Sequence, residues 1–182
     1  MPEDVKVPAF FYRLSPRSQR SYLKSEAIDR YNFVPNGASL ARSQTLLMTL
    51  ESGSLAAINR SAQTLIDEVC RVMDVSPVRV EIRGVRPRDP RSELHGLFYP
   101  NARPPRMIVW MRTAQRHDVV KPKTFLRTLL HELGHYLDYA ALNLGDSFHT
   151  KGFFKRESFL VRSLYAPPPI NLPSIARAPK AP

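Results

Sequence analysis

The feature that most constrains this chain is a short motif of two histidines four residues apart with a glutamate after the first, His131-Glu132-Leu133-Gly134-His135. The apolar residues around the motif recur at helical spacing, which predicts an α-helix. Pro122 is expected to open this helix, and Gly145 to close it by taking the left-handed conformation that ends many helices. The apolar positions are Phe125, Leu126, Leu129, Leu130, Leu133, Leu137, Ala140, Ala141 and Leu142.

On such a helix the two histidines lie on the same face. Positions four apart are separated by about 6 Å along the axis and about 40° around it, so His131 and His135 can share one metal ion. Glu132 lies about 100° round from His131, where its carboxylate can reach a water molecule without being a ligand itself. Zinc suits this set, because it accepts neutral imidazole nitrogens and keeps a position open for water. A helix that carries the motif by chance is the alternative, but polar groups in an apolar helix need partners.

A zinc site needs a third protein ligand, and two residues further along the chain are candidates. The longer pattern H-E-x-x-H-x-x-G-x-x-H is not continued, because Asp138 and Ala141 stand where that pattern has glycine and histidine. His149 is the leading candidate, since it follows the predicted end of the helix and a short loop can turn it back. Glu157 is the rival, because it lies in an apolar stripe of the next predicted helix, where a carboxylate needs a partner.

Two acidic residues are also expected to support the site from behind the ligands. Glu157, where it is not itself a ligand, can hold the second ring nitrogen of a ligand histidine or pair with an arginine. Asp138 lies three residues after His135 on the same face of the helix, where it can orient a histidine or cap a nearby loop. Both are therefore predicted as supporting residues or alternative ligands.

The rest of the pattern predicts an α+β fold. Helices are expected over residues 15–31, 38–50, 55–74 and 151–165, and strands over 78–82, 94–99 and 107–112. A short turn joins the last two strands, which suggests a hairpin. We expect a zincin-like arrangement, with a small, mostly antiparallel sheet packed on the long helix at 55–74 and on the helix that carries the motif.

Breaks in the pattern divide the chain into three parts. Residues 1–50 are expected to form an N-terminal helical extension, and residues 51–165 the zincin-like domain. Residues 166–182 form a proline-rich basic tail that is expected to be disordered. Cys70 is the single cysteine, so an internal disulfide is excluded, and its place on the apolar side of a predicted helix indicates core packing.

The formal net charge of +11 indicates that anionic molecules are candidate partners of this chain. It is compatible with nucleic acid binding through a basic surface, or with scattered arginines that only keep the protein in solution, because no basic run is dense. No apolar run approaches the length of a membrane span, so no membrane partner is expected. The N-terminus begins with acidic residues and lacks the apolar core of a signal peptide, which predicts a cytoplasmic protein.

The motif and the residues after it resemble the SprT-like zinc metalloproteases. The resemblance depends on His131 to His135, followed by His149-Thr150-Lys151-Gly152-Phe153-Phe154, in which Phe153 holds the place of an aromatic residue four positions after the loop histidine. It covers about residues 78–165. It implies one zinc ion held by His131, His135 and His149, with Glu132 as general base. The family includes proteases that act on proteins crosslinked to DNA, and many members carry a C-terminal cysteine zinc ribbon that this chain lacks.

Two functions follow as expectations. The first is a zinc-dependent metallopeptidase that hydrolyses peptide bonds with a metal-activated water, with the protein or peptide substrate added as an extra strand along an exposed edge of strand 107–112. The second is a non-catalytic binding or regulatory protein that associates with nucleic acid and keeps only the zincin scaffold.

Overall fold

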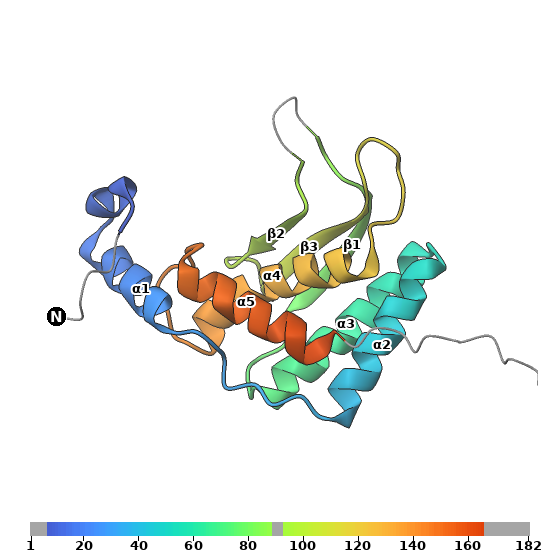
Figure 1. Ribbon diagram of the computed structural model, residues 1–182, viewed down its shortest axis with the longest axis horizontal. Coiled ribbons are helices and arrows are strands. Elements are labelled where there is room, and N and C mark those ends of the chain that lie inside the picture. Colours follow the sequence, from blue (N-terminus) through green and yellow to red (C-terminus); the bar gives the residue numbers. More distant parts are fainter. Residues whose placement is uncertain (1–6, 89–92, 166–182) are drawn as a thin grey trace, which may run out of the picture.

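The computed structural model describes residues 7–88 and 93–165 and confirms the α+β class (Figure 1). The predicted tail, 166–182, lies outside the described residues. Within them, a short 3-10 helix at Ala9–Arg13 precedes five α-helices and a three-stranded sheet. The helices are α1 (Pro16–Ala27), α2 (Gly37–Glu51), α3 (Leu55–Val72), α4 (Pro122–Ala140) and α5 (Lys151–Leu164), and the strands are β1 (Arg79–Val85), β2 (Gly96–Tyr99) and β3 (Arg106–Arg112).

The sheet is mixed, with the strand order β1-β3-β2. Strand β1 pairs with β3 in parallel, and β2 pairs with β3 antiparallel as the predicted hairpin. The prediction of a mostly antiparallel sheet was therefore wrong. So was the prediction that strand 107–112 has an exposed edge, because β3 lies in the centre. The physical reason is that Met107 to Met111 are all buried, and a strand buried on both faces takes the middle of a sheet.

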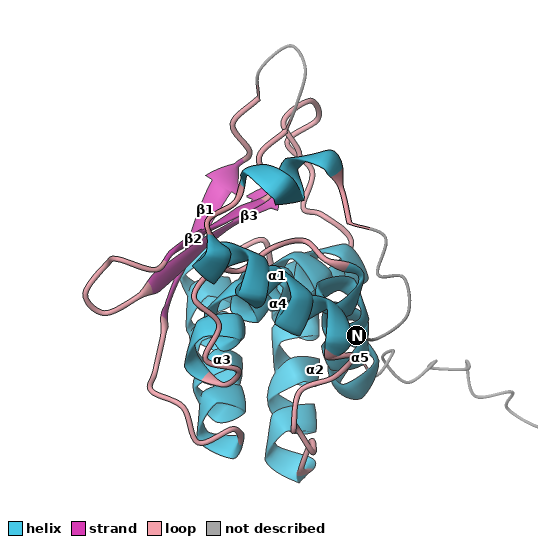
Figure 2. Cartoon of the chain, turned by 90° about the vertical axis from the view of Figure 1, so that its left-hand side faces the viewer, coloured by secondary structure: helices cyan, strands magenta, loops and turns pink. Residues whose placement is uncertain are grey.

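The helices form layers on one face of the sheet. Helices α3 and α4 pack directly against the strands, α2 packs on α3, and α5 packs on α4 and α1. Figure 2 shows the sheet at one side of this group of helices. Alternation sends Val80 and Ile82 of β1 and Val109 of β3 into the core, where apolar side chains of α3 and α4 meet them. Burial of this apolar surface is the main force that fixes α4 against the sheet.

Helix α4 carries the histidine motif through the middle of the molecule. Pro122 stands in its first turn as predicted, and the helix ends at Ala140. The left-handed residue that follows is Asn143, with φ of 51°, so the prediction that Gly145 has this role was wrong. Asparagine tolerates this conformation, and the backbone N–H of Gly145 instead donates to the hydroxyl of Ser21 at 3.0 Å.

The N-terminal residues share the core with the rest of the described chain. Leu46, Leu47 and Leu50 of α2 are buried in the same cluster as the apolar residues of α3, α4 and α5. Helix α1 ends at Ala27, earlier than predicted, and the extended chain after it buries Tyr31 and Phe33. Cys70 is buried, as predicted. Among the described helices, none combines the length and the apolar character required to span a bilayer.

Candidate metal centre

Three histidine side chains converge beside the second half of α4. His131 and His135 come from successive turns of α4, and His149 comes from the loop that precedes α5. The Nε2 atom of His149 lies 3.0 Å from Nε2 of His131 and 3.1 Å from Nε2 of His135. Nitrogens bound tetrahedrally to one zinc at about 2.05 Å are about 3.3 Å apart, so these separations are close to those of a zinc site. The three histidines can therefore bind a metal ion.

The carboxylate of Glu157 fixes the orientation of His131. Its Oε2 atom lies 2.9 Å from Nδ1 of His131, and Arg127 lies 3.5 Å from its other oxygen. Because an ionised carboxylate only accepts, Nδ1 of His131 carries a proton, and in the neutral ring Nε2 is then the nitrogen with the lone pair. Glu157 therefore contacts His131 on the side of the ring opposite to the other two histidines. The structure brings His149 to the histidine pair and leaves Glu157 outside the group.

A serine that sequence reasoning missed has the matching role at His135. The hydroxyl of Ser147 donates to Oδ2 of Asp138 at 2.8 Å. The Oγ atom of this serine also lies 2.8 Å from Nδ1 of His135. Since its single proton is used on Asp138, this oxygen accepts the Nδ1 proton of His135. Nε2 of His135 is thus the nitrogen with the free lone pair. Like Nε2 of His131, it lies next to Nε2 of His149.

Asp138 belongs to a fully buried ion pair behind the histidines. Arg156 donates to both of its oxygens, at 2.9 and 3.2 Å, and both side chains have no exposed surface. The hydroxyl of Tyr31 donates to Oδ1 at 3.0 Å. Burial raises the pKa of the Asp138 carboxyl above its ordinary value, while Arg156, Ser147 and Tyr31 oppose that rise. Donors to both oxygens favour the ionised form of Asp138. Its contact with Ser147, which lies in the loop after α4 and bonds to His135, is compatible with both predicted roles, capping a loop and orienting a histidine.

Two phenylalanines hold the imidazole rings in place. The ring of Phe153 stacks on His135 with centroids 4.7 Å apart, and it contacts His131 and His149 by its edge. Phe154 stacks on His149 with centroids 5.7 Å apart. Burial and the two neighbouring histidines lower the pKa of His135 to about 3, and burial and His131 lower that of His149. Both are therefore neutral at pH 7, which is the form that binds metal.

Glu132 lies beside the histidines in one cavity of about 360 Å³. Glu132 is buried, with 6% of its surface exposed, and its side chain packs against Gly96 of β2, where a Cβ atom would lie 2.7 Å from Cγ of Glu132. Burial raises the pKa of Glu132 to about 7, and His131 opposes the rise. A divalent cation at the histidines would favour the ionised form and lower this pKa. The cavity is completed by Leu97, Phe98, Pro100, Tyr139 and Ser147.

The predicted residues therefore occupy one small region. His131, Glu132, His135 and His149 line the cavity, while Glu157 and Asp138 lie behind the rings of His131 and His135. Sequence reasoning missed Gly96, Ser147 and Arg156, which act through contacts between residues far apart in the chain. Comparisons with protein-family models, with curated proteins and with solved structures found no match to this chain.

Proposed function

We propose that this chain is a zinc-dependent metallopeptidase. The observation that supports the proposal most is the convergence of three imidazole nitrogens in one cavity with the buried carboxylate of Glu132. His131, His135 and His149 would be the ligands of one zinc ion. Three imidazole nitrogens with a carboxylate beside them form a donor set that leaves a position for water, as hydrolytic zinc sites require.

The mechanism follows from what each side chain can do. Zinc, when bound, polarises the scissile carbonyl and makes water acidic enough to ionise near neutral pH. Glu132 accepts the proton of the attacking water and passes it to the leaving amine. Glu157 and Ser147 hold the Nδ1 protons of His131 and His135, so both rings keep Nε2 towards the metal position.

Strand β2 is the element along which a peptide substrate would lie. It is an edge strand of the sheet, and Gly96, Leu97 and Phe98 of this strand line the cavity. The backbone of an edge strand has unpaired N–H and C=O groups, so an extended peptide can add to it and cross the metal position. This replaces the substrate path along β3, which is closed because β3 lies in the centre of the sheet.

We also propose that the chain is a SprT-like zincin. Support comes from the placement of His149 in the loop after the motif helix and from Phe153, which packs on all three histidine rings. The combination of a sheet, the backing helix α3 and the motif helix α4 is compatible with that fold. A compact zinc peptidase of this type would act on protein or peptide substrates.

The proposal is tested by metal analysis and proteolysis of the full chain. We expect the purified protein to bind one zinc ion and to digest a denatured protein, and expect chelators to abolish digestion. Glu132→Gln should keep the zinc and lose activity by about 10²-fold or more, because the general base is absent. Glu51→Gln, at an exposed position on α2, is the matched control and should retain full activity. Full activity of Glu132→Gln would end the general-base assignment.

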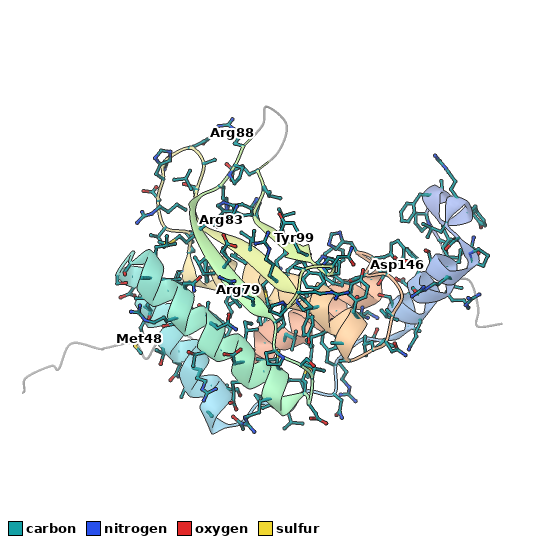
Figure 3. The ribbon with its side chains drawn as sticks, turned by 180° about the vertical axis from the view of Figure 1, so that it is seen from behind. Met48, Arg79, Arg83, Arg88, Tyr99 and Asp146 are labelled. Carbon is teal, nitrogen blue, oxygen red and sulfur yellow. The ribbon has the colours of Figure 1, made fainter. Side chains whose placement is uncertain are left out.

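The second candidate function is nucleic acid binding without catalysis. It is favoured by a hollow of about 390 Å³ at the sheet, lined by Arg79, Arg103 and Arg106 together with Tyr99. Figure 3 shows Arg79 and Tyr99 on this side of the molecule. Binding to single-stranded DNA that weakens steeply with salt, with no digestion of any protein by the zinc-loaded chain, would favour this function.

A further inference from the structure

A second hollow runs along the outer face of α5, next to the metal centre. Its volume is about 700 Å³, and we call it the α5 groove. Helical spacing places Lys151, Phe154, Lys155 and Arg162 on one face of α5. Arg30, in the extended chain after α1, also lines the groove. The other members include Phe159 and the acidic residue Asp29.

The groove carries an excess of positive charge. Asp29 is neutralised by Lys155, whose Nζ atom lies 3.0 Å from its Oδ1. Arg30, Lys151 and Arg162 form no ion pair with any residue in the described part of the chain, and all three are exposed. Three cations that form no ion pair therefore surround one hollow, and the rings of Phe154 and Phe159 give it an apolar side. One carboxylate lies close by, since Glu26 accepts from the backbone N–H of Lys151 at 2.8 Å.

The groove adjoins the metal centre at Phe154. The ring of Phe154 stacks on His149 and also lines the groove. Along the helix axis, Phe154 and Arg162 are about 12 Å apart, at 1.5 Å per residue. An extended peptide covers this distance with about four residues, at about 3.3 Å each. A peptide that crosses the metal position can therefore reach the cations of the groove.

We propose that the α5 groove selects substrates with acidic side chains three to five residues from the bond that is cleaved. This inference rests on the proposed peptidase function and names its substrate class. Aspartate or glutamate carboxylates would face Arg30, Lys151 and Arg162, while the apolar parts of the peptide would contact Phe154 and Phe159. The C-terminal segment 166–182 does not suit the groove, because it contains Arg177 and Lys180 and no acidic side chain.

The test uses pairs of fluorescent peptides that share one cleavable bond. Each pair differs only in two glutamates or two glutamines placed three to five residues before or after that bond. For the glutamate peptide on one side of the bond, we expect kcat/KM of the zinc-loaded chain to be about tenfold higher, mainly through KM, because charge complementarity favours binding. Anisotropy measurements with Glu132→Gln give the same preference without cleavage, so the inference is separable from the peptidase function.

Charge-neutralising variants locate the preference. The double variant Lys151→Gln and Arg162→Gln should reduce the preference for glutamate to below twofold. The control Arg13→Gln and Arg60→Gln removes the same charge at exposed positions that line neither the groove nor the metal-site cavity, and it should leave the preference unchanged.

Three outcomes would overturn the inference. The first is cleavage of both peptides of every pair at equal rates, which would leave the peptidase function intact. The second is an equal loss of preference in the control variant, which would assign the effect to net charge. The third is that the chain shows no preference for glutamate peptides, while a single-stranded oligonucleotide binds to it and this binding is lost in the double variant of Lys151 and Arg162. In contrast, preferential binding of the glutamate peptides with no cleavage of any substrate would support the proposed role of the groove and contradict the peptidase proposal.

Discussion

Gly96 makes room for the carboxylate of Glu132. An added Cβ at this position would overlap the side chain of Glu132, so Gly96→Ala must displace the proposed general base. We expect this variant to keep its zinc and to lose activity by about 10-fold to 10²-fold, because a shift of about 1 Å in a catalytic group has effects of this size. Steady-state proteolysis combined with metal analysis measures both quantities.

The control for Gly96 is another glycine of the sheet. Gly84→Ala adds the same methyl group in β1, where no atom lies within 4 Å of the new Cβ, and it should be fully active. If Gly96→Ala retained the activity of the unchanged protein, the carboxylate of Glu132 would not need its observed position.

Ser147 determines which nitrogen of His135 is free for metal. Ser147→Ala removes the acceptor of the Nδ1 proton, so the ring of His135 can rotate or change tautomer. We expect zinc affinity, measured by competition with a chromophoric chelator, to fall by about 10-fold to 10²-fold. The free energy of unfolding without metal should also fall, by about 1–3 kcal/mol, because the buried carboxylate of Asp138 loses a donor.

The conservative variant separates positioning by Ser147 from a general structural effect. Ser147→Thr keeps the hydroxyl and should restore most of the zinc affinity. Nitrogen NMR of the apo protein should show the Nδ1-protonated tautomer of His135 in Ser147→Thr but a mixture in Ser147→Ala. An unchanged tautomer and an unchanged zinc affinity in Ser147→Ala would remove this residue from the site.

At the residue scale, the sequence predicted the groups whose spacing is local. His131, Glu132 and His135 are fixed relative to one another by one helix, so their pattern alone predicts their geometry. Gly96 and Ser147 have no such pattern, because each acts through a contact made only when separate elements pack together. His149 was selected by the chemistry of zinc and by its place after the helix, rather than by any spacing rule.

Glu68 joins α2 and α3, two helices that contribute no residue to the candidate metal centre. It is buried on α3, where it accepts from Arg71, from the Asn36 side chain at the start of α2, and from Arg42 of α2. Hydrogen bonds from Arg71 and Asn36 are the main cause of a pKa lowered to about 2. Because the folded-state pKa is below the ordinary value, this stabilisation is present above about pH 4.5 and is lost as the pH falls towards 2.

The lowered pKa of Glu68 gives a prediction about the packing of α2 on α3. Glu68→Gln should lower the free energy of unfolding at pH 6, and the deficit should shrink as the pH falls from about 4.5 to about 3. Urea unfolding at several pH values measures the deficit. Asp67→Asn, at the exposed neighbouring position, is the control and should have little effect. A deficit that stays constant across this range would assign the loss to packing rather than to the charge of Glu68.

At the element scale, helices were predicted better than the sheet. Ser15, Asn36 and Ser54 cap helices α1, α2 and α3 through bonds to nearby backbone N–H groups, and such signals are local. Strand pairing is not local, and the alternation in β1 is the same whether β1 pairs in parallel or antiparallel. The decisive signal was the continuous apolar run of β3, which indicates a central strand.

At the scale of the whole molecule, the candidate metal centre draws its three histidines from two separate elements that side-chain contacts also hold together. His131 and His135 belong to α4, whereas His149 belongs to the loop that leads into α5. Behind them, Arg156 of α5 donates to Asp138 of α4 and to the backbone oxygens of Ser25 and Ile28 at the end of α1. A zinc ion would therefore add a cross-link between α4 and the start of α5, two of the three helices that this buried arginine already connects.

Zinc should accordingly stabilise the whole described fold rather than the site alone. A ligand at about 1,000 times its Kd stabilises the folded state by about 4 kcal/mol. For a chain of this size, about 1 kcal/mol corresponds to about 2–4 °C, so we expect zinc to raise Tm by about 8–16 °C. Differential scanning calorimetry of the apo and zinc-loaded protein measures the shift, and EDTA should reverse it.

Variants of the two candidate ligands decide which residue completes the site. His149→Ala should abolish most of the zinc-dependent rise in Tm, because the third nitrogen is lost. Glu157→Gln should reduce the rise only in part, because an amide oxygen can still accept the Nδ1 proton of His131. The opposite order would make Glu157 the ligand and would require its carboxylate to move to the Nε2 side of His131. Such a movement would also break the contact between Arg127 and Glu157. The change in zinc-dependent Tm and the loss of this contact can be checked in the same pair of variants.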